Sequence, residues 1–299
     1  MSEGKERAEA RLSNLEAIEP LLGSLRVLSL STMQMALNRQ ASLSAYSERF
    51  SLVAAQVRSL VGSKLEKLAV EERFDYTPVE QNQVLAVIGS SRGICGQYNK
   101  QLAKLTSQRL ERERDLPAKV VAFGVRVQRA LAQEGIEFER RETLGQGSRP
   151  AYDLAAQLLR GWKAAYEQGT LARVEILSFR KTGSNSYSPV ITTLLPASGI
   201  SSEEGEPTQL PFPPPIIEGN PERMLVQIES HLLAIRFYQL ILDAIAAENL
   251  YRYRLLEEAK ENTSNLLEEL TLAIQSERRK EITQQLQELL VGSGMLAQR

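Results

Sequence analysis

The sequence is short of the residues on which much enzyme chemistry depends. Among its 299 residues there is a single cysteine, Cys95, a single histidine, His231, and one tryptophan. One cysteine excludes an internal disulfide, and one cysteine with one histidine excludes a zinc site built on these residue types alone. A Ser-His-Asp or Cys-His mechanism would have to use His231. Composition therefore removes several enzyme classes and names none, and we expect no catalytic residue, metal site or cofactor in this chain.

The chain also lacks an excess of either charge. Its 36 Lys and Arg residues face 37 Asp and Glu residues, which argues against a nucleic-acid binder that neutralises many phosphates. With 42% hydrophobic residues, it is too polar for membrane insertion. The first twenty residues mix acids with bases and hold no apolar run of a signal peptide. These features favour a reducing, cytoplasmic-side location.

Glycine and proline are missing from two long stretches. Neither occurs in the 70 residues between Pro221 and Gly292, nor in the 38 residues between Gly23 and Gly62. At about 1.5 Å per residue the first stretch would make a helix of roughly 105 Å. A helix of that length cannot be buried along its whole length within this chain.

Both stretches repeat apolar residues at steps of three and four, which is typical of a coiled-coil seam. In the C-terminal stretch the expected seam positions are Leu225, Ile228, Leu232, Ile235, Leu242, Ala246, Ala259, Thr263, Leu266, Leu270, Ala273, Ile282, Leu286 and Leu289. In the N-terminal stretch they are Leu25, Leu28, Thr32, Met35, Leu43, Tyr46, Phe50, Val53 and Val57. We expect the two helices to pair with each other.

The middle of the chain has a different pattern. Apolar runs at 84–88 and 119–123 are each followed by glycine and a helical segment, and a third strand candidate spans 136–140. Segments 173–179 and 190–194 are expected to close an edge hairpin. Alternating strands and helices indicate a small open Rossmann-like α/β domain. The predicted fold is thus α/β: a long antiparallel coiled coil of the terminal helices with this domain inserted.

The predicted parts follow in a simple order. They are an N-terminal long helix over 1–75, the α/β domain over 76–200, a linker over 201–221 and a C-terminal long helix over 222–299. The linker holds six of the twelve prolines, a composition typical of an extended connection.

The turn after the first strand is the main candidate for ligand chemistry. Gly89, Gly93 and Gly96 lie between a strand and a helix N-terminus, where N–H groups could meet a phosphate. Their spacing matches neither G-x-G-x-x-G nor the P-loop motif. A structural turn, or a protein contact through Arg92, is the favoured interpretation. A small α/β nucleotide-binding enzyme with a helical stalk remains an alternative.

Three motifs carry a resemblance to a known family. They are LSTMQM from Leu30 to Met35, SRGICGQYN from Ser91 to Asn99, and a C-terminal set of Glu269–Leu272, Arg278, Ile282, Thr283, Leu286, Glu288, Leu289, Val291, Gly292 and Leu296. In this order, between long terminal helices, they resemble the gamma subunit of the F-type ATP synthases. The resemblance covers nearly the whole chain.

The resemblance implies the non-catalytic rotor, or central stalk, of an ATP synthase that couples ion translocation to ATP synthesis. The implied partners are the alternating alpha and beta subunits of the catalytic hexamer, an epsilon-type subunit and the membrane c-ring. The implied location is peripheral, on the cytoplasmic or equivalent face of an energy-transducing membrane, and the expected source is bacterial. A gamma-like coiled-coil scaffold outside a rotary complex is a second alternative.

Residue by residue, the resemblance implies three groups of partner contacts. Arg278 and Thr283 match positions near the tip of the shaft, and the neighbouring Arg279, which stands where the family has Gln, is a further contact candidate. Met33 and Met35 match the paired N-terminal helix. Ser91, Arg92 and Cys95 match the loop that faces the lever region of the catalytic subunits.

Overall fold

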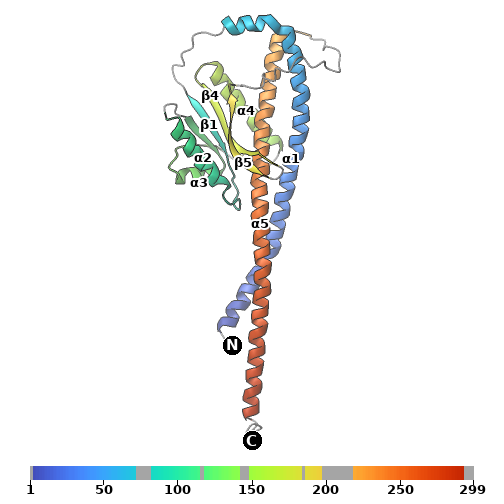
Figure 1. Ribbon diagram of the computed structural model, residues 1–299, viewed down its shortest axis with the longest axis vertical. Helices are drawn as coiled ribbons and strands as arrows, with labels where there is room; N and C mark the ends of the chain where they lie inside the picture. The colour runs from blue at the N-terminus through green and yellow to red at the C-terminus, as the bar shows by residue number, and fades with distance from the viewer. Residues whose placement is uncertain are drawn as a thin grey trace. The chain divides into compact units, whose positions relative to one another are not determined.

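The computed structural model describes residues 3–71, 82–114, 118–141, 148–183, 186–196 and 218–292. Its elements run in the order α1 (Glu3–Glu71), β1 (Gln83–Ile88), α2 (Tyr98–Arg112), β2 (Ala118–Phe123), α3 (Val125–Gln133), β3 (Glu139–Arg141), α4 (Ser148–Glu167), β4 (Arg173–Lys181), β5 (Tyr187–Leu195) and α5 (Pro221–Gly292) (Figure 1). Most of the predicted linker lies outside the described residues. The chain divides into two compact units: residues 1–30 with 252–299, and residues 31–251.

The larger unit contains a five-stranded sheet in the order β3-β2-β1-β4-β5. Strand β1 pairs in parallel with β2 and β4, and β2 pairs in parallel with β3. Strands β4 and β5 form an antiparallel hairpin at one edge. The predicted open α/β sheet with an edge hairpin is confirmed, although its third strand is shorter and begins later than expected.

Both faces of the sheet are buried, which explains the continuous apolar runs in its parallel strands. On one face, Leu85 and Val87 of β1 pack in a cluster with Leu102 of α2 and Leu131 of α3. On the other face, Ala86 and Ile88 belong to a cluster with side chains of α4 and α5. Alternate residues of one strand therefore serve two separate cores.

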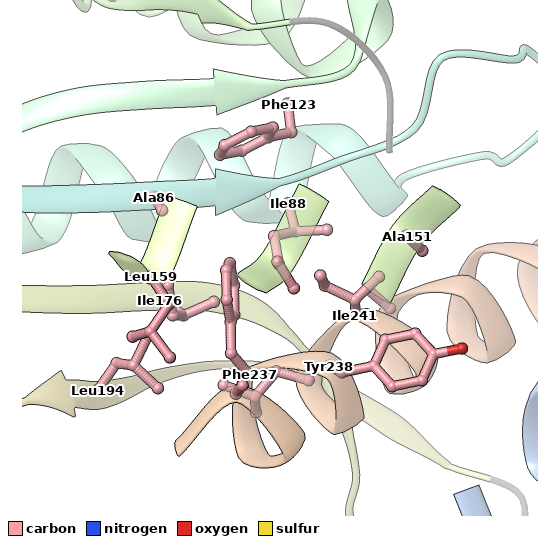
Figure 2. Packing of buried hydrophobic residues seen from close by; sticks show 14 of the residues in the cluster. Ala86, Ile88, Phe123, Ala151, Leu159, Ile176, Leu194, Phe237, Tyr238 and Ile241 are labelled. Atoms are coloured by element: carbon pink, nitrogen blue, oxygen red, sulfur yellow. The ribbon is translucent and has the colours of Figure 1, made fainter. Parts of the chain in front are cut away.

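Helix α5 supplies much of the second core. Phe237 and Ile241 are fully buried and Tyr238 is 1% exposed. Figure 2 shows them beside Ile88, Phe123 and the α4 residues Ala151 and Leu159. Burial of apolar surface, at about 25 cal/mol per Å², thus attaches this part of α5 to the sheet.

Within the larger unit, α1 and α5 run antiparallel. Gln40 bonds to Asp243 at 2.7 Å, and Arg58 pairs with Glu229 at 2.6 Å, so rising numbers in α1 meet falling numbers in α5. Ala54, Val57 and Val61 pack in one cluster with residues of α5 that include the predicted seam positions Leu225, Ile228 and Leu232. Pairing of the terminal helices is confirmed here.

The smaller unit consists of the remaining parts of the same two helices. Arg26 pairs with Glu257 at 2.5 Å and Lys5 with Glu281 at 2.7 Å, again in antiparallel order. Leu256 is fully buried and Thr263 is 8% exposed. Many other apolar residues of this unit remain exposed.

One window of α5 has the length and composition that would allow a helix to cross a membrane, but 72% of it is buried inside the protein. Its apolar residues face the sheet and α1, as the contacts of Leu233, Phe237 and Ile241 show. The apolar character of this window is therefore accounted for by the core.

Candidate partner-contact surfaces

The turn between β1 and α2 is fastened to the neighbouring turn after β2. The Gly89 N–H donates to the Phe123 carbonyl at 3.0 Å, and the Arg126 N–H donates to the Ser90 carbonyl at 3.0 Å. The backbones approach so closely that a Cβ on Gly124 would lie 2.6 Å from the Ser90 oxygen. Gly124 also has φ +111°, a conformation that favours glycine.

At Gly89, the first glycine of the turn, the structure leaves no open space for a phosphate. A Cβ on Gly89 would lie 2.2 Å from the Cβ of Val127, so α3 already fills that space. The N–H groups of Gly89 and Ser90 are both engaged inside the protein. Gly89 is thus required for close packing, which favours the structural interpretation of this turn over nucleotide binding.

The tip of the turn reaches the surface. Arg92 is exposed and Ile94 is 47% exposed, while Ser91 is half-buried with its hydroxyl oxygen buried and unpaired. Cys95 is only 5% exposed, so its side chain faces the protein interior. Of the three predicted contacts here, Arg92 is the one whose side chain is exposed.

The predicted contacts on the long helices also differ in exposure. Met33 is half-buried and packs against the sheet cluster, whereas Met35 is 63% exposed. Arg278, Arg279 and Thr283 are all exposed on α5. The Thr283 hydroxyl donates to the Arg279 carbonyl at 2.8 Å, which leaves its oxygen as an acceptor and its methyl group for contact with a partner.

An apolar stripe at the end of α5 is exposed, although three of its four residues are expected seam positions. Ile282, Leu286, Leu289 and Leu290 are between 44% and 69% exposed and share one helix face by their spacing. The prediction that Ile282, Leu286 and Leu289 lie buried in a seam with α1 is wrong within this chain, because these side chains are 51%, 55% and 69% exposed. The spacing was visible in the sequence, but its partner was not.

Several charged groups are perturbed by their surroundings. Burial raises the pKa of Asp243, an effect partly offset by the Gln40 hydrogen bond and by the charges of Arg180 and Lys181. Burial also raises the pKa of Tyr187, which lies near Asp243. In the smaller unit, the hydrogen bond from Lys5 lowers the pKa of Glu281. Among the described residues, no group of three or more His, Cys, Asp or Glu could hold a metal ion.

These features define a class of protein: two very long terminal helices that pair in antiparallel order, an α/β domain inserted between them, and an apolar helix end left uncovered. The family model described as ATP synthase matches residues 5–296. The chain therefore belongs to the ATP synthase gamma-chain family, and the resemblance carried by its motifs is confirmed.

Individual relatives agree with this family. The chain is 23% identical over 294 residues to the ATP synthase gamma chain of Rhodopirellula baltica, covering 95% of this chain and 96% of the relative. It is also 23% identical over 286 residues to the gamma chain of Moorella thermoacetica, covering 96% of each.

Solved structures show the same fold. A chain of the Euglena gracilis mitochondrial ATP synthase, in a structure of OSCP, F1 and c-ring, matches with a TM-score of 0.61 at 12% identity, covering 98% of this chain and 94% of that one. A chain of the Tetrahymena thermophila mitochondrial ATP synthase central stalk and c-ring matches with a TM-score of 0.52 at 16% identity, covering 80% and 99%. The predicted fold class is confirmed, and the comparisons favour the gamma-chain interpretation over the two alternatives.

Proposed function

We propose that this chain is the rotor subunit of an ATP synthase, a shaft that transmits torque and holds no reaction centre of its own. The observation that carries this proposal is the apolar stripe of Ile282, Leu286, Leu289 and Leu290 at the end of α5. Exposed apolar surface of this kind marks an interaction site. The end of a single helix that is apolar on one face would fit inside a ring of apolar side chains in a partner assembly, which we call the apolar collar.

We propose that the alpha and beta subunits of the catalytic hexamer provide this collar. Arg278 and Arg279, exposed just before the stripe, add positive charge for contact with acidic groups of the catalytic subunits. Thr283 lies on the next turn. These three residues would meet different subunits in succession as the shaft turns, which converts rotation into changes of the catalytic sites.

A different part of the chain would meet the membrane rotor. We propose contacts of the α/β domain and the base of the helices with the c-ring and with an epsilon-type subunit. The chain would then lie as a peripheral subunit on the cytoplasmic face of an energy-transducing membrane. Arg92, Met35 and the turn around Ser91 are the candidates for contact with the catalytic subunits along the shaft.

Replacement of the apolar stripe tests this proposal. We expect the double variant Leu286→Ser and Leu289→Ser to weaken association with a cognate alpha–beta hexamer by at least about tenfold, because each side chain buried in a partner contributes roughly 1.5–3 kcal/mol. The measurement is co-purification and ATP hydrolysis of the reconstituted complex. Urea unfolding of the isolated chain should change little.

The matched control is Gln284→Ser with Gln287→Ser, two exposed polar residues on the same turns. It should leave association unchanged. A wild-type chain that never co-purifies with the hexamer would support the scaffold alternative instead. An assembled Leu286→Ser, Leu289→Ser complex with normal hydrolysis would show that the stripe is not the contact.

A further inference from the structure

Ile94 is held in a backbone conformation that it would not adopt unaided. Its φ is +58°, in the left-handed region, and it is the non-glycine residue with positive φ among those the structure describes. For a β-branched side chain this conformation is a strong outlier. Because its side chain is 47% exposed, packing of that side chain does not supply the compensation. Strain of this kind persists only where neighbouring contacts over-determine it.

A buried amide supplies those contacts. Asn99, 8% exposed in the first turn of α2, accepts the Ser90 N–H at 3.0 Å with its Oδ1. Its Nδ2 donates to the Ser90 Oγ at 2.8 Å and to the Cys95 Sγ at 3.2 Å. One side chain thus joins the two ends of the turn, with Arg92 and Ile94 between them.

The neighbouring residue fastens this turn to the long helix. Tyr98 is 1% exposed, and its hydroxyl donates to the Ala244 carbonyl of α5 at 3.2 Å. Its ring stacks on Phe179 of β4, with ring centroids 4.4 Å apart, and meets the edge of Tyr251. Aromatic pairs of this geometry contribute beyond the area that they bury.

We propose that Asn99 and Tyr98 are positioning residues for the exposed surface formed by Arg92 and Ile94. Asn99 holds the turn closed with Ile94 in its strained conformation, and Tyr98 ties the closed turn to α5. A force applied to Arg92 or Ile94 is then transmitted to α5, because the turn between them does not deform. This proposal rests on the proposed function only for the identity of the partner that contacts Arg92 and Ile94. The closed turn itself is a property of the isolated chain.

The only cysteine of the chain reports directly on the turn. Cys95 Sγ is buried and lies within hydrogen-bond distance of Ser90 and Asn99, so a thiol reagent reaches it only when the turn opens. The experiment measures the rate at which a maleimide labels Cys95 in the full-length chain without denaturant. We expect Asn99→Ala to raise this rate by about tenfold or more, since it removes three bonds at a buried site.

Two further variants separate positioning from general loss of stability. Thr106→Ala removes a fully buried hydroxyl from the same helix, one that donates to the Leu102 carbonyl and not to the turn, and should leave the labelling rate within about twofold. Ser90→Ala keeps the backbone bond to Asn99 and should raise the rate by about threefold, which decides the matter if Asn99→Ala does not fold. Unchanged labelling in the folded Asn99→Ala or Ser90→Ala chain would overturn the proposal.

Tyr98→Phe tests the tie to α5. It keeps the stacked ring and removes the hydroxyl, so we expect the ratio of ions moved to ATP hydrolysed in a reconstituted complex to fall while hydrolysis continues. A purely structural role would leave that ratio unchanged. Failure of the hexamer to bind the wild-type chain would refute the proposed function. The labelling rates of the isolated chain test the closed turn independently of that result.

Discussion

The same helix serves two opposite purposes in the two units. In the larger unit, α5 residues 232–247 are mostly buried against the sheet, α4 and α1. In the smaller unit, Leu272, Ile282, Leu286 and Leu289 of the same helix are more than half exposed. Both stretches are apolar at helical spacing. The two stretches differ in whether other segments of this chain pack over their apolar face. A periodic apolar pattern therefore predicts that a helix face makes a contact, but it does not say which partner the face contacts.

The largest contrast in stability is expected between Phe237 and Leu289. Phe237→Ala empties a fully buried site and should lower the free energy of unfolding by about 3–5 kcal/mol. Leu289→Ala, at a side chain that is 69% exposed, should change it by no more than about 0.5 kcal/mol. Urea unfolding followed by circular dichroism measures both. Equal effects would mean that the end of α5 is covered in the isolated chain.

A smaller effect is expected from two glycines of the larger unit. Gly89→Ala would push a methyl group into Val127 and should destabilise the chain by about 1–3 kcal/mol. Gly161→Ala, inside α4 with nothing within 4 Å of the added carbon, should stabilise it by about 0.5–1 kcal/mol. Opposite signs in thermal or urea unfolding would confirm the close approach of the two turns. A tolerated alanine at position 89 would contradict it.

The smallest effect is expected from the charge of Asp243, and it depends on pH. Burial raises the pKa of Asp243 in the folded chain above its ordinary value of 3.8. The contribution of the protonated group to the free energy of unfolding is therefore complete below about pH 3.8 and is lost as the pH rises through the folded-state pKa. Asp243→Asn keeps an oxygen for the Gln40 bond and removes the buried charge. The variant should therefore be more stable than wild type at pH 7. The gain should vanish as pH falls toward 4, and a gain independent of pH would show another cause.

Most of the fold could be predicted because its signals are local. The apolar run Val84–Ile88 predicts a strand, and β1 is buried on both faces; segments 173–179 and 190–194 predict the β4–β5 hairpin. The third strand was placed too early because Ile136 and Phe138 are apolar. In the structure these two residues pack against the cluster that holds Leu85, Leu102 and Leu131, and pairing with β2 begins only at Glu139.

The candidate site could be predicted only in part, because exposure depends on contacts between distant segments. Arg92, Arg278 and Arg279 are exposed, whereas Cys95 is held inside by Ser90 and Asn99. The strained backbone of Ile94 has no signature in the sequence, since an isoleucine gives no reason to expect positive φ. Whether each predicted residue contacts a partner stays a prediction.

The two edges of the sheet affect whether copies of the isolated chain can associate strand to strand. Strand β3 is three charged residues long, and β5 carries Pro189, which has no N–H to offer a further strand. Both edges thereby discourage strand-to-strand polymerisation. Exposed apolar side chains, including those at the end of α5, are then the surface that limits the solubility of the isolated chain.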